Sequence, residues 1–415
     1  MPPARKRRVA GNVEESSYLD LMASFEGDAT LVTPDTVDTV VPTNYVIWDN
    51  VLGLRGIPFG GRVTQLMGEE HSGKSTLAYH LARAYQQSTD KPVILFDFEG
   101  TATIDYLRLA GMKVDRNHLG LFREHDLLEC TRRCIRFMQA GVKFFIFDSV
   151  PRMKYMQAEK DIVAGDPYKA TVGLHARAMQ MFFDAVLPHA QRHDCALIMI
   201  NQTRAKITTN PQEAFLMKFE NIARPNITLP GGTAMKFTPA LTIETKKGKA
   251  LRAGDGDSDW AYEPATGSKK GERILNRSHL RILKNKVSMS GYRETDFYFR
   301  PGSGIDPNVS LRDLAVSYGL ITRAGGKYVI GPEEDPIITY NTKDEAIADF
   351  VVASNPEVMA ALAQILAQRI DESDASRFAA EVTPEEEFAV GARESLDGED
   401  GTSTNVLTFD DDDED

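Results

Sequence analysis

The stretch Gly68–Thr76 constrains the fold more than any other part of this chain. It reads GEEHSGKST and fits the G-x-x-x-x-G-K-S pattern of phosphate-binding loops. Residues 61–67 before it alternate as a strand does, and residues 77–86 after it carry apolar side chains at helical spacing. Between a strand and a helix, such a loop can turn its backbone N–H groups and the helix N-terminus toward an anion. The sequence therefore predicts an α/β fold with a nucleotide site.

The residues of this loop have separate predicted roles. Lys74 should reach the β- and γ-phosphates, and Ser75 should hold Mg²⁺. ATP and Mg²⁺ are accordingly the expected cofactors. A glycine-rich turn that matches by chance is the alternative, and the flanking strand and helix argue against it. The residues expected to surround the nucleotide are Gly68, Glu69, Glu70, His71, Ser72, Gly73, Lys74, Ser75 and Thr76.

Two further predicted strands end in acidic residues. Residues 91–99 and 144–149 contain apolar runs that are typical of parallel strands covered on both faces. Asp148, after four apolar residues, is expected to join the Mg²⁺ shell. Glu99 could orient a water molecule for attack on the γ-phosphate, because open α/β sheets place their chemistry at the carboxyl ends of strands. Its position alone is equally compatible with a strand cap.

Two long loops are predicted to leave the same edge of the sheet. Residues 150–172 follow the strand that ends near Asp148, and residues 203–230 follow another buried strand at 196–202. Basic residues in both loops suggest a track for a nucleic-acid backbone. Solvated surface loops remain an open alternative. The basic residues that begin the two loops are Arg152, Lys154, Arg204 and Lys206.

The following region contains a second predicted helix start and two strands. Residues 231–237 resemble a helix start with open backbone N–H groups. Strands are predicted at 241–245 and 279–284, with a polar, flexible hairpin at 246–277 between them. Lys284 and Lys286 should lie on one face, because strand side chains alternate with a period of two.

The acidic charge of the chain is concentrated at one end. Residues 371–415 hold 17 acidic residues and two arginines, whereas the whole chain has a net charge of −12. The remaining 370 residues therefore carry +3, which is compatible with nucleic-acid binding. Because this tail is also poor in apolar residues, it is predicted to be disordered.

The remaining composition indicates a cytosolic protein. The chain has no apolar run of about 18 residues, so no membrane span is expected. Its N-terminus lacks the apolar segment of a signal peptide. Three cysteines, Cys130, Cys134 and Cys195, form no metal-binding set, and buried reduced thiols are expected.

Four parts of the chain are predicted from these patterns. Residues 1–44 form an N-terminal arm and linker, and residues 45–305 form the ATPase core. Residues 306–370 form a small C-terminal α/β domain, with helices near 311–318, 343–353 and 356–370 and a short strand at 327–330. The acidic tail, 371–415, completes the chain. Helices in the core are expected at 127–139 and 172–187.

The order of these motifs resembles the RecA family of recombinases, as a bacteriophage-encoded or otherwise divergent bacterial member. The resemblance covers roughly residues 45–370. The segments INQ and KNK are more specific than the phosphate-binding loop. The matching segments, in order, are GEEHSGKS at 68–75, FDFE at 96–99, Tyr106, FDS at 147–149, INQTRAKI at 200–207, GGTAMKF at 231–237 and KNK at 284–286.

The family resemblance implies a RecA-like P-loop ATPase core with a mainly parallel central sheet, preceded by an oligomerisation arm. It implies a DNA-dependent ATPase that forms helical filaments on single-stranded DNA and pairs it with homologous duplex. The implied partners are both forms of DNA, further copies of the chain, and single-strand-binding or mediator proteins, with no membrane. The implied location is the cytoplasm, or the host cytoplasm and nucleoid for a phage protein.

The resemblance also implies roles for individual residues. Glu99 resembles the catalytic base, Tyr106 the adenine-stacking aromatic, and Gln202 the γ-phosphate sensor. Lys284 and Lys286 resemble the pair that reaches the γ-phosphate of a neighbouring subunit. The residues implied to contact DNA are Arg152, Lys154, Arg177, Arg204, Lys206, Ile207, Gly231, Gly232 and Thr233.

The chain departs from the family pattern at several positions. His71 stands where the bacterial family usually has serine. Asp184 stands where the family has an additional cation. The second loop and the 246–277 insertion are longer than usual, which leaves DNA contacts beyond Ile207 undefined.

Two other functions fit parts of the pattern. A ring-forming helicase motor would share the core fold, although it would be expected to lack the KNK segment. A recombination mediator with a degenerate ATP site is a non-enzymatic alternative. The intact set of Lys74, Ser75, Glu99 and Asp148 argues against it.

Overall fold

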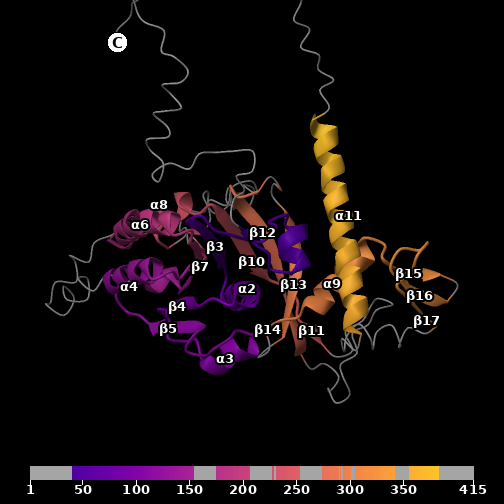
Figure 1. Ribbon diagram of the computed structural model, residues 1–415, viewed down its shortest axis with the longest axis horizontal. Coiled ribbons are helices and arrows are strands. Elements are labelled where there is room, and N and C mark those ends of the chain that lie inside the picture. Colours follow the sequence, from indigo (N-terminus) through magenta and orange to yellow (C-terminus); the bar gives the residue numbers. More distant parts are fainter. Residues whose placement is uncertain are drawn as a thin grey trace, which may run out of the picture. The chain divides into compact units, whose positions relative to one another are not determined.

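The computed structural model describes residues 40–153, 174–205, 227–228, 230–252, 273–288, 290, 293–300, 304–324, 326–341 and 355–382 (Figure 1). The chain's contacts divide it into two compact units, 1–368 and 369–415. The domain boundaries expected at 44/45 and 305/306 stay predictions.

A ten-stranded sheet forms the centre of the first unit. Its strand order is β14-β13-β12-β10-β3-β7-β6-β4-β5, and β11 pairs with β12. The run from β10 to β5 is parallel, whereas β12, β13 and β14 are added antiparallel, so the predicted mainly parallel sheet is confirmed. The strands are β3 (Arg62–Gly68), β4 (Val93–Asp97), β5 (Leu119–Arg123), β6 (Phe144–Asp148), β7 (Ala196–Gln202), β10 (Leu241–Lys247), β11 (Leu251–Arg252), β12 (Arg273–Asn285), β13 (Glu294–Arg300) and β14 (Gly304–Ile305).

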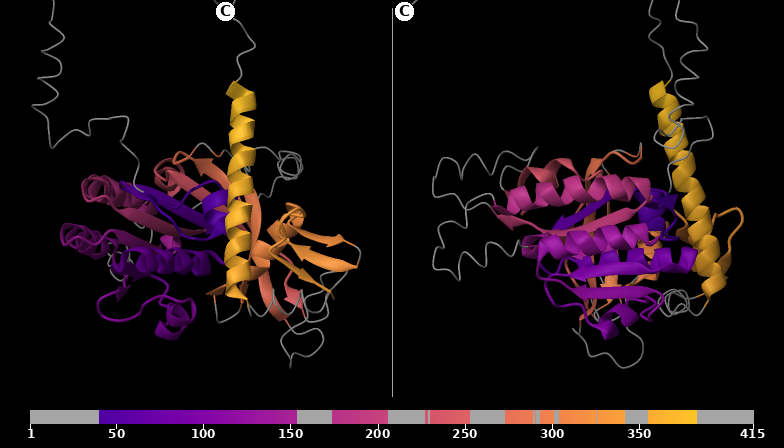
Figure 2. Two further views of the ribbon diagram at one scale, coloured as in Figure 1. Left: turned by 45° about the vertical axis from the view of Figure 1, so that its right-hand side comes forward. Right: turned by 60° about the vertical axis from the view of Figure 1, so that its left-hand side comes forward.

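Helices cover both faces of the parallel part (Figures 1 and 2). Along β4, Leu95 packs with α2 and α3, whereas Phe96 packs with α4, α6 and α8. This alternation explains why a parallel strand can be apolar throughout. The helical elements of the core are η1 (Ile47–Val51), α2 (Lys74–Thr89), α3 (Ile104–Leu109), α4 (Leu127–Gln139), η2 (Val150–Arg152), α6 (Leu174–Arg192) and α8 (Gly232–Phe237).

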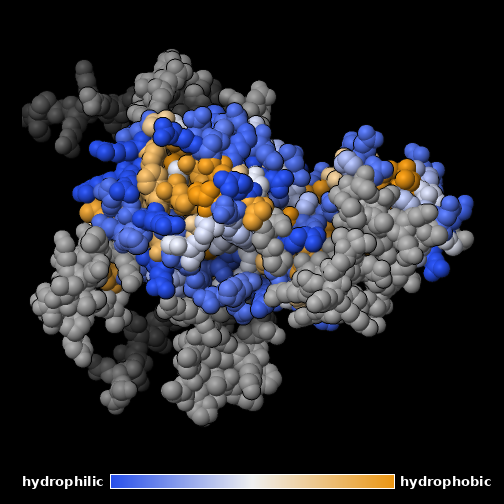
Figure 3. Space-filling model, turned by 90° about the horizontal axis from the view of Figure 1, so that it is seen from below, coloured by the Kyte–Doolittle hydropathy of each residue, from blue (hydrophilic) through white to orange (hydrophobic). Residues whose placement is uncertain are grey.

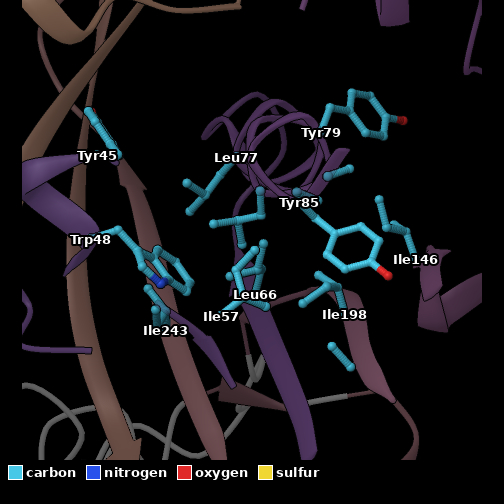
Figure 4. Close-up of a cluster of buried hydrophobic side chains, with 14 of the residues drawn as sticks. Tyr45, Trp48, Ile57, Leu66, Leu77, Tyr79, Tyr85, Ile146, Ile198 and Ile243 are labelled. Carbon is cyan, nitrogen blue, oxygen red and sulfur yellow. The ribbon is translucent and has the colours of Figure 1, made fainter. Parts of the chain in front are cut away.

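The core beside α2 holds the strand that leads into the phosphate-binding loop. Leu66 of β3 lies below Leu77 of α2, and Trp48 fills the space beside them (Figure 4). The Trp48 indole N–H donates to the Gly56 carbonyl at 2.9 Å, so its one polar group is satisfied in the interior. This packing fixes the position from which the loop leaves the sheet.

The local sequence explains where several helices begin and end. α4 spans the predicted residues 127–139, because the Asp126 side chain accepts from the Leu128 N–H at its start. α2 begins at Lys74, three residues before the predicted start. α6 continues past Pro188, where it was predicted to stop, because Val186 and Ala190 on either side are buried in one core. That end was predicted wrongly.

Three other features correct or complete the sequence analysis. β12 begins at Arg273, so the end of the predicted flexible insertion is a strand. The strands β5 and β13 were not predicted at all. All three cysteines are buried and free, as expected.

Short elements complete the first unit. β1 pairs with β2 and β8 pairs with β9, in two separate two-stranded sheets. The predicted helix near 311–318 and strand at 327–330 are present as α9 and β16, and β16 is the centre of a three-stranded sheet. The bounds are β1 (Val40–Val41), β2 (Ile57–Pro58), β8 (Arg204–Ala205), β9 (Ile227–Thr228), α9 (Pro307–Ser317), β15 (Ile321–Ala324), β16 (Lys327–Ile330) and β17 (Ile338–Tyr340).

The last described helix, α11 (Pro356–Val382), is longer than predicted. It was expected to end at residue 370, and residues 371–382 were assigned to a disordered tail. Those twelve residues are helical, so that assignment was wrong for them. The predicted helix at 343–353 lies outside the described residues.

On the face seen in Figure 3, hydrophobic residues gather in one area that is bordered by hydrophilic residues. Large hydrophobic side chains that remain exposed include Leu109, Met181 and Phe237. Among the described residues, no helix combines the length and hydropathy needed to span a lipid bilayer.

Candidate nucleotide site and nucleic-acid interface

A cavity of about 730 Å³ lies where β3, β4, β6 and β7 end. It brings together the phosphate-binding loop, the two acidic strand ends and the Tyr106 side chain. Its lining residues are Glu70, His71, Gly73, Lys74, Ser75, Thr76, Glu99, Thr101, Tyr106, Asp148, Ile200, Gln202, Lys247, Asn276 and Phe299. Residues predicted from distant motifs thus share one site.

The loop conformation needs its glycines. Gly73 has a φ of 85°, and a Cβ there would lie 2.9 Å from Phe297. At Gly68 an added Cβ would lie 2.1 Å from the Thr245 carbonyl oxygen. A side chain at either position would force the loop away from β10 or β13.

Distant residues also hold the loop. The hydroxyls of Ser72 and Thr245 lie 2.6 Å apart. The Ser278 hydroxyl donates to the Ser72 carbonyl at 2.5 Å. Neither Thr245 nor Ser278 was predicted as a site residue, because no local sequence motif marks them.

Lys74 lies at the start of α2 and donates to the Glu69 carbonyl within the loop. Burial lowers the pKa of Lys74, and the carboxylates of Asp148, Glu99, Glu70 and Glu69 act in the opposite direction. Its ammonium therefore lies inside the curve of the loop, where a phosphate would replace the carbonyl as its partner.

The Asp148 carboxylate is 4% exposed and accepts hydrogen bonds from Ser75 and from Tyr79, the latter at 3.2 Å. Burial raises the pKa of Asp148 from 3.8 to about 6, the Ser75 bond lowers it, and the nearby Glu99 charge raises it. A buried carboxylate beside a hydroxyl suits a divalent cation, because the cation offsets the cost of burying the negative charge.

The oxygen chemistry of this pair fits Mg²⁺. Mg²⁺ commonly uses one or two protein ligands together with substrate phosphates and water. Ser75 and Asp148 would hold the ion beside Lys74. The described residues contain no group of three or more histidine, cysteine, aspartate or glutamate side chains with the spacing of a metal site.

Glu99 is held from two sides. Its Oε1 accepts from the Ser149 hydroxyl and from Gln202 Nε2, the latter at 3.0 Å. Gln202 is the last residue of β7, so the carboxylate is bonded directly to the start of the second long loop. The Glu99 carboxylate faces the cavity and bonds to side chains at the ends of other strands, which a residue that only caps its own strand would not do.

Asp97, which the sequence analysis passed over, supports the segment that carries Glu99. Its carboxylate accepts from the backbone N–H groups of residues 99–102 at 2.8–3.4 Å. It is 1% exposed. The signal that could have identified it is the glycine at 100, which has a φ of 72° and turns the chain back over the carboxylate.

Tyr106 lies beside the first turn of α2, where its hydroxyl is 2.6 Å from that of Thr76. Its ring lines the cavity, as the predicted adenine-stacking role requires. On the opposite strands, Lys247, Asn276 and Phe299 also line the cavity and were not predicted.

The two lysines of the KNK segment lie outside this cavity. Lys284 Nζ donates to the carbonyls of Phe237 at 2.7 Å and Lys236 at 3.3 Å, at the end of α8. Burial lowers the pKa of Lys284, and the nearby Lys286 lowers it further, so the two cations are close together as the strand pattern predicted. Lys286 is exposed.

Some of the predicted DNA contacts lie near each other. Arg152 and Arg177 are exposed on η2 and α6. Gly231 and Gly232 begin α8, and a Cβ on Gly232 would lie 2.5 Å from that of Ala176, so α8 starts against the first turn of α6.

The other predicted contacts are less completely described. Thr233 is exposed in the first turn of α8. Arg204 lies in β8 opposite Thr228. Lys154, Lys206 and Ile207 lie outside the described residues.

The chain matches known proteins along most of its length. A model of the RecA N-terminal domain family matches residues 30–306. The protein named Protein RecA of Aquifex pyrophilus is 29% identical over 338 residues, covering 78% of this chain and 85% of that protein. Proteins of the same name from Borrelia duttonii (strain Ly) and Geobacter sulfurreducens are each 28% identical, over 74% and 70% of this chain and 77% and 75% of their own lengths.

Proposed function

Because the chain belongs to the RecA family, we propose that it is an ATP-dependent DNA recombinase. It forms helical filaments on single-stranded DNA and catalyses homologous pairing and strand exchange. The observation that carries this proposal is the hydrogen bond between Glu99 and Gln202, which joins the carboxylate of the nucleotide cavity to the loop after β7.

ATP binds in the cavity with its phosphates in the loop 68–75. The loop's backbone N–H groups and Lys74 neutralise the phosphates, and Tyr106 stacks on the base. Ser75 and Asp148 would hold Mg²⁺, which would supply charge stabilisation to the transferred phosphoryl group.

Glu99 acts as the general base for hydrolysis. Its carboxylate orients a water molecule in line with the γ-phosphate and accepts the proton from it. Ser149 and Gln202 fix the direction of this carboxylate through their hydrogen bonds to Oε1. The products are ADP and phosphate.

Gln202 couples the nucleotide to DNA. Its amide can exchange its bond to Glu99 for one to the γ-phosphate, which would move the first residues of the following loop. DNA held by Arg152, Arg177, Arg204 and the start of α8 would favour one of these positions. The predicted contacts Lys154, Lys206 and Ile207 belong to the same proposed interface.

Lys284 and Lys286 extend the site to a neighbouring subunit. In the free chain, Lys284 is bonded to the end of α8. In a filament the pair would contact the neighbour's γ-phosphate, so that ATP becomes part of the interface between subunits. In this arrangement residues 18–40 would be the arm that docks on the adjacent subunit.

The remaining expectations concern location and partners. We place the protein in the cytoplasm, or in the host cytoplasm and nucleoid if it is phage-encoded. Single-strand-binding and mediator proteins are its expected partners for loading.

The first experiment is ATP hydrolysis without DNA, with single-stranded DNA and with duplex. Strong stimulation by single strands that is lost in Lys74→Ala supports the proposal and leads to a strand-exchange assay. Glu99→Gln should lower turnover by about 100-fold or more while ATP and DNA still bind, because general bases contribute about 10²–10⁴. Equal turnover under all three conditions would reject a DNA-dependent ATPase.

A further inference from the structure

His175, in the first turn of α6, makes a hydrogen bond that plays no part in the proposed nucleotide chemistry. Its Nε2 lies 3.0 Å from the carbonyl oxygen of Val150, 25 residues earlier in the chain. A carbonyl oxygen only accepts, so Nε2 carries a hydrogen and donates it. The bond joins the start of α6 to the short helix η2.

The segment η2 is tied at its other end to the catalytic carboxylate. The Ser149 hydroxyl donates to Glu99. From Ser149 to Met153 the chain makes one tight turn, in which the Arg152 N–H donates to the Ser149 carbonyl at 3.0 Å and the Met153 N–H donates to the Val150 carbonyl at 3.1 Å. A displacement of Val150 is therefore transmitted to Ser149, because they are adjacent in one hydrogen-bonded turn.

The packing around Val150 leaves little room for independent movement. Its side chain is fully buried, and a Cβ on Gly231 would lie 3.4 Å from its Cγ1 and 2.3 Å from Met235 of α8. The neighbouring Ala176 meets the start of α8 at Gly232. The first turns of α6 and α8 and the turn η2 therefore form one packed group.

Glu99 is connected through hydrogen bonds to two parts of the predicted DNA interface. Gln202 joins Glu99 to the loop after β7, and Ser149 joins it through η2 and His175 to α6, where Arg177 is exposed. We propose that His175 is a positioning residue that transmits DNA contact at the start of α6 to Glu99 through its hydrogen bond to Val150. This inference rests on the proposed function, because it assumes that DNA binds near the start of α6.

The test uses three substitutions at one position. His175→Gln keeps an N–H donor at about the distance of Nε2, whereas His175→Asn is too short to reach and His175→Ala has no donor. His189→Ala, half-buried near the other end of α6, is the matched control. For each full-length protein, ATP turnover is measured against the concentration of single-stranded DNA, and DNA affinity is measured separately with a labelled oligodeoxythymidylate.

We expect His175→Ala and His175→Asn to lower the maximal DNA-stimulated turnover by about tenfold, a size typical of coupling between two sites. The affinity for DNA should stay within about twofold, because the DNA contacts themselves are kept. His175→Gln should restore most of the stimulation, and His189→Ala should behave as the unsubstituted protein.

Three results would overturn the inference. One is full stimulation in His175→Ala. Another is a loss in His175→Gln equal to that in His175→Ala, which would assign the effect to the ring and not to the bond. The third is a loss of DNA affinity that accounts for the lost stimulation, which would make His175 a DNA contact.

A second measurement needs neither DNA nor turnover. Hydrogen exchange of the free protein reports the amides of Arg152 and Met153 directly. His175→Ala should speed their exchange by about fivefold or more, since the bond that orders the turn is lost. Unchanged exchange would show that His175 does not order this turn, and would reject the inference. This outcome is independent of DNA. Turnover that does not respond to DNA would instead reject the proposed function.

Discussion

β4 and β6 both end in an aspartate at the same register position, yet the two aspartates have different hydrogen-bond partners. β4 reads VILFD and β6 reads FFIFD, and Asp97 pairs with Asp148 across the parallel strands. Both are almost fully buried. Asp97 accepts four backbone N–H groups from the segment that carries Glu99, whereas Asp148 faces the hydroxyls of Ser75 and Tyr79.

This difference separates a structural carboxylate from one that can bind a metal. Four N–H donors occupy the lone pairs of Asp97 and compensate its burial within the protein. Asp148 has hydroxyl partners that can rotate, and burial raises its pKa to about 6, so its negative charge lacks full compensation. A cation would supply what is missing.

Asp148→Asn tests the metal-binding role of Asp148. Turnover of ATP should fall by about a thousandfold, because the charge stabilisation from a bound metal is worth several kcal/mol. The measurement is steady-state hydrolysis over a range of Mg²⁺ concentrations. Asp105→Asn, at an exposed carboxylate on α3, is the control, and an Asp148→Asn protein with normal turnover would refute the metal role.

Asp97→Ala tests the structural role of Asp97. Loss of the acceptor leaves several N–H groups without partners, and each costs about 1–3 kcal/mol when buried, so the free energy of unfolding should fall by about 3 kcal/mol. Urea denaturation followed by circular dichroism measures this. Asp148→Asn in the same experiment should show no such loss, and equal destabilisation of the two variants would erase the distinction.

The pH dependence of stability provides a third comparison. The pKa of Asp148 is about 6 in the folded protein and 3.8 as its reference, so the folded state binds more protons than the unfolded state between these values. Stability should therefore fall as pH rises from about 4 to 6, by about 2–3 kcal/mol, because one pKa unit corresponds to about 1.4 kcal/mol.

This fall is measured on protein treated with a chelator, by comparing the unsubstituted chain with Asp148→Asn. The difference between their free energies of unfolding isolates the contribution of the one carboxylate. A difference that is constant across this pH range would mean that Asp148 is not held in an unfavourable charged state.

The smallest expected effect comes from Tyr79→Phe. The Tyr79 hydroxyl donates to Asp148 at 3.2 Å, so its removal should raise the pKa of that carboxylate further. The free energy of unfolding should change by about 1 kcal/mol, the usual value of one hydrogen bond. Chelated protein should show the pH-dependent fall displaced to higher pH. A fall at the same pH would indicate that Ser75 alone sets the proton affinity.

Much of the parallel sheet could be predicted because its signals are local. The apolar runs that became β4, β6 and β7 are continuous and end in polar residues, and the Asp126 cap marks the start of α4. β5 was missed because its apolar run is interrupted by Gly120 and is only partly buried at the sheet edge. The tail assignment failed at 371–382 because composition does not exclude a helix that continues from the apolar turns before it.

The site residues likewise differ in whether a local sequence signal identifies them. Lys74, Ser75, Asp148 and Glu99 lie in short segments whose order identifies them. Thr245 and Ser278 hold the loop from 173 and 206 residues away, and no pattern in the sequence connects them to Ser72. Asp97 was missed because its strand reads like that of Asp148, and only the turn that follows distinguishes the two.

The distant support of Ser72 also sets an order of events during synthesis. β3 leaves the ribosome early, but its two neighbours, β7 and β10, are formed from residues 196–202 and 241–247. The loop gains its last hydrogen bond only after Ser278 emerges. A nascent chain therefore carries an unpaired β3 until residues 196–202 have emerged, and we predict that a chaperone would bind this strand during that interval.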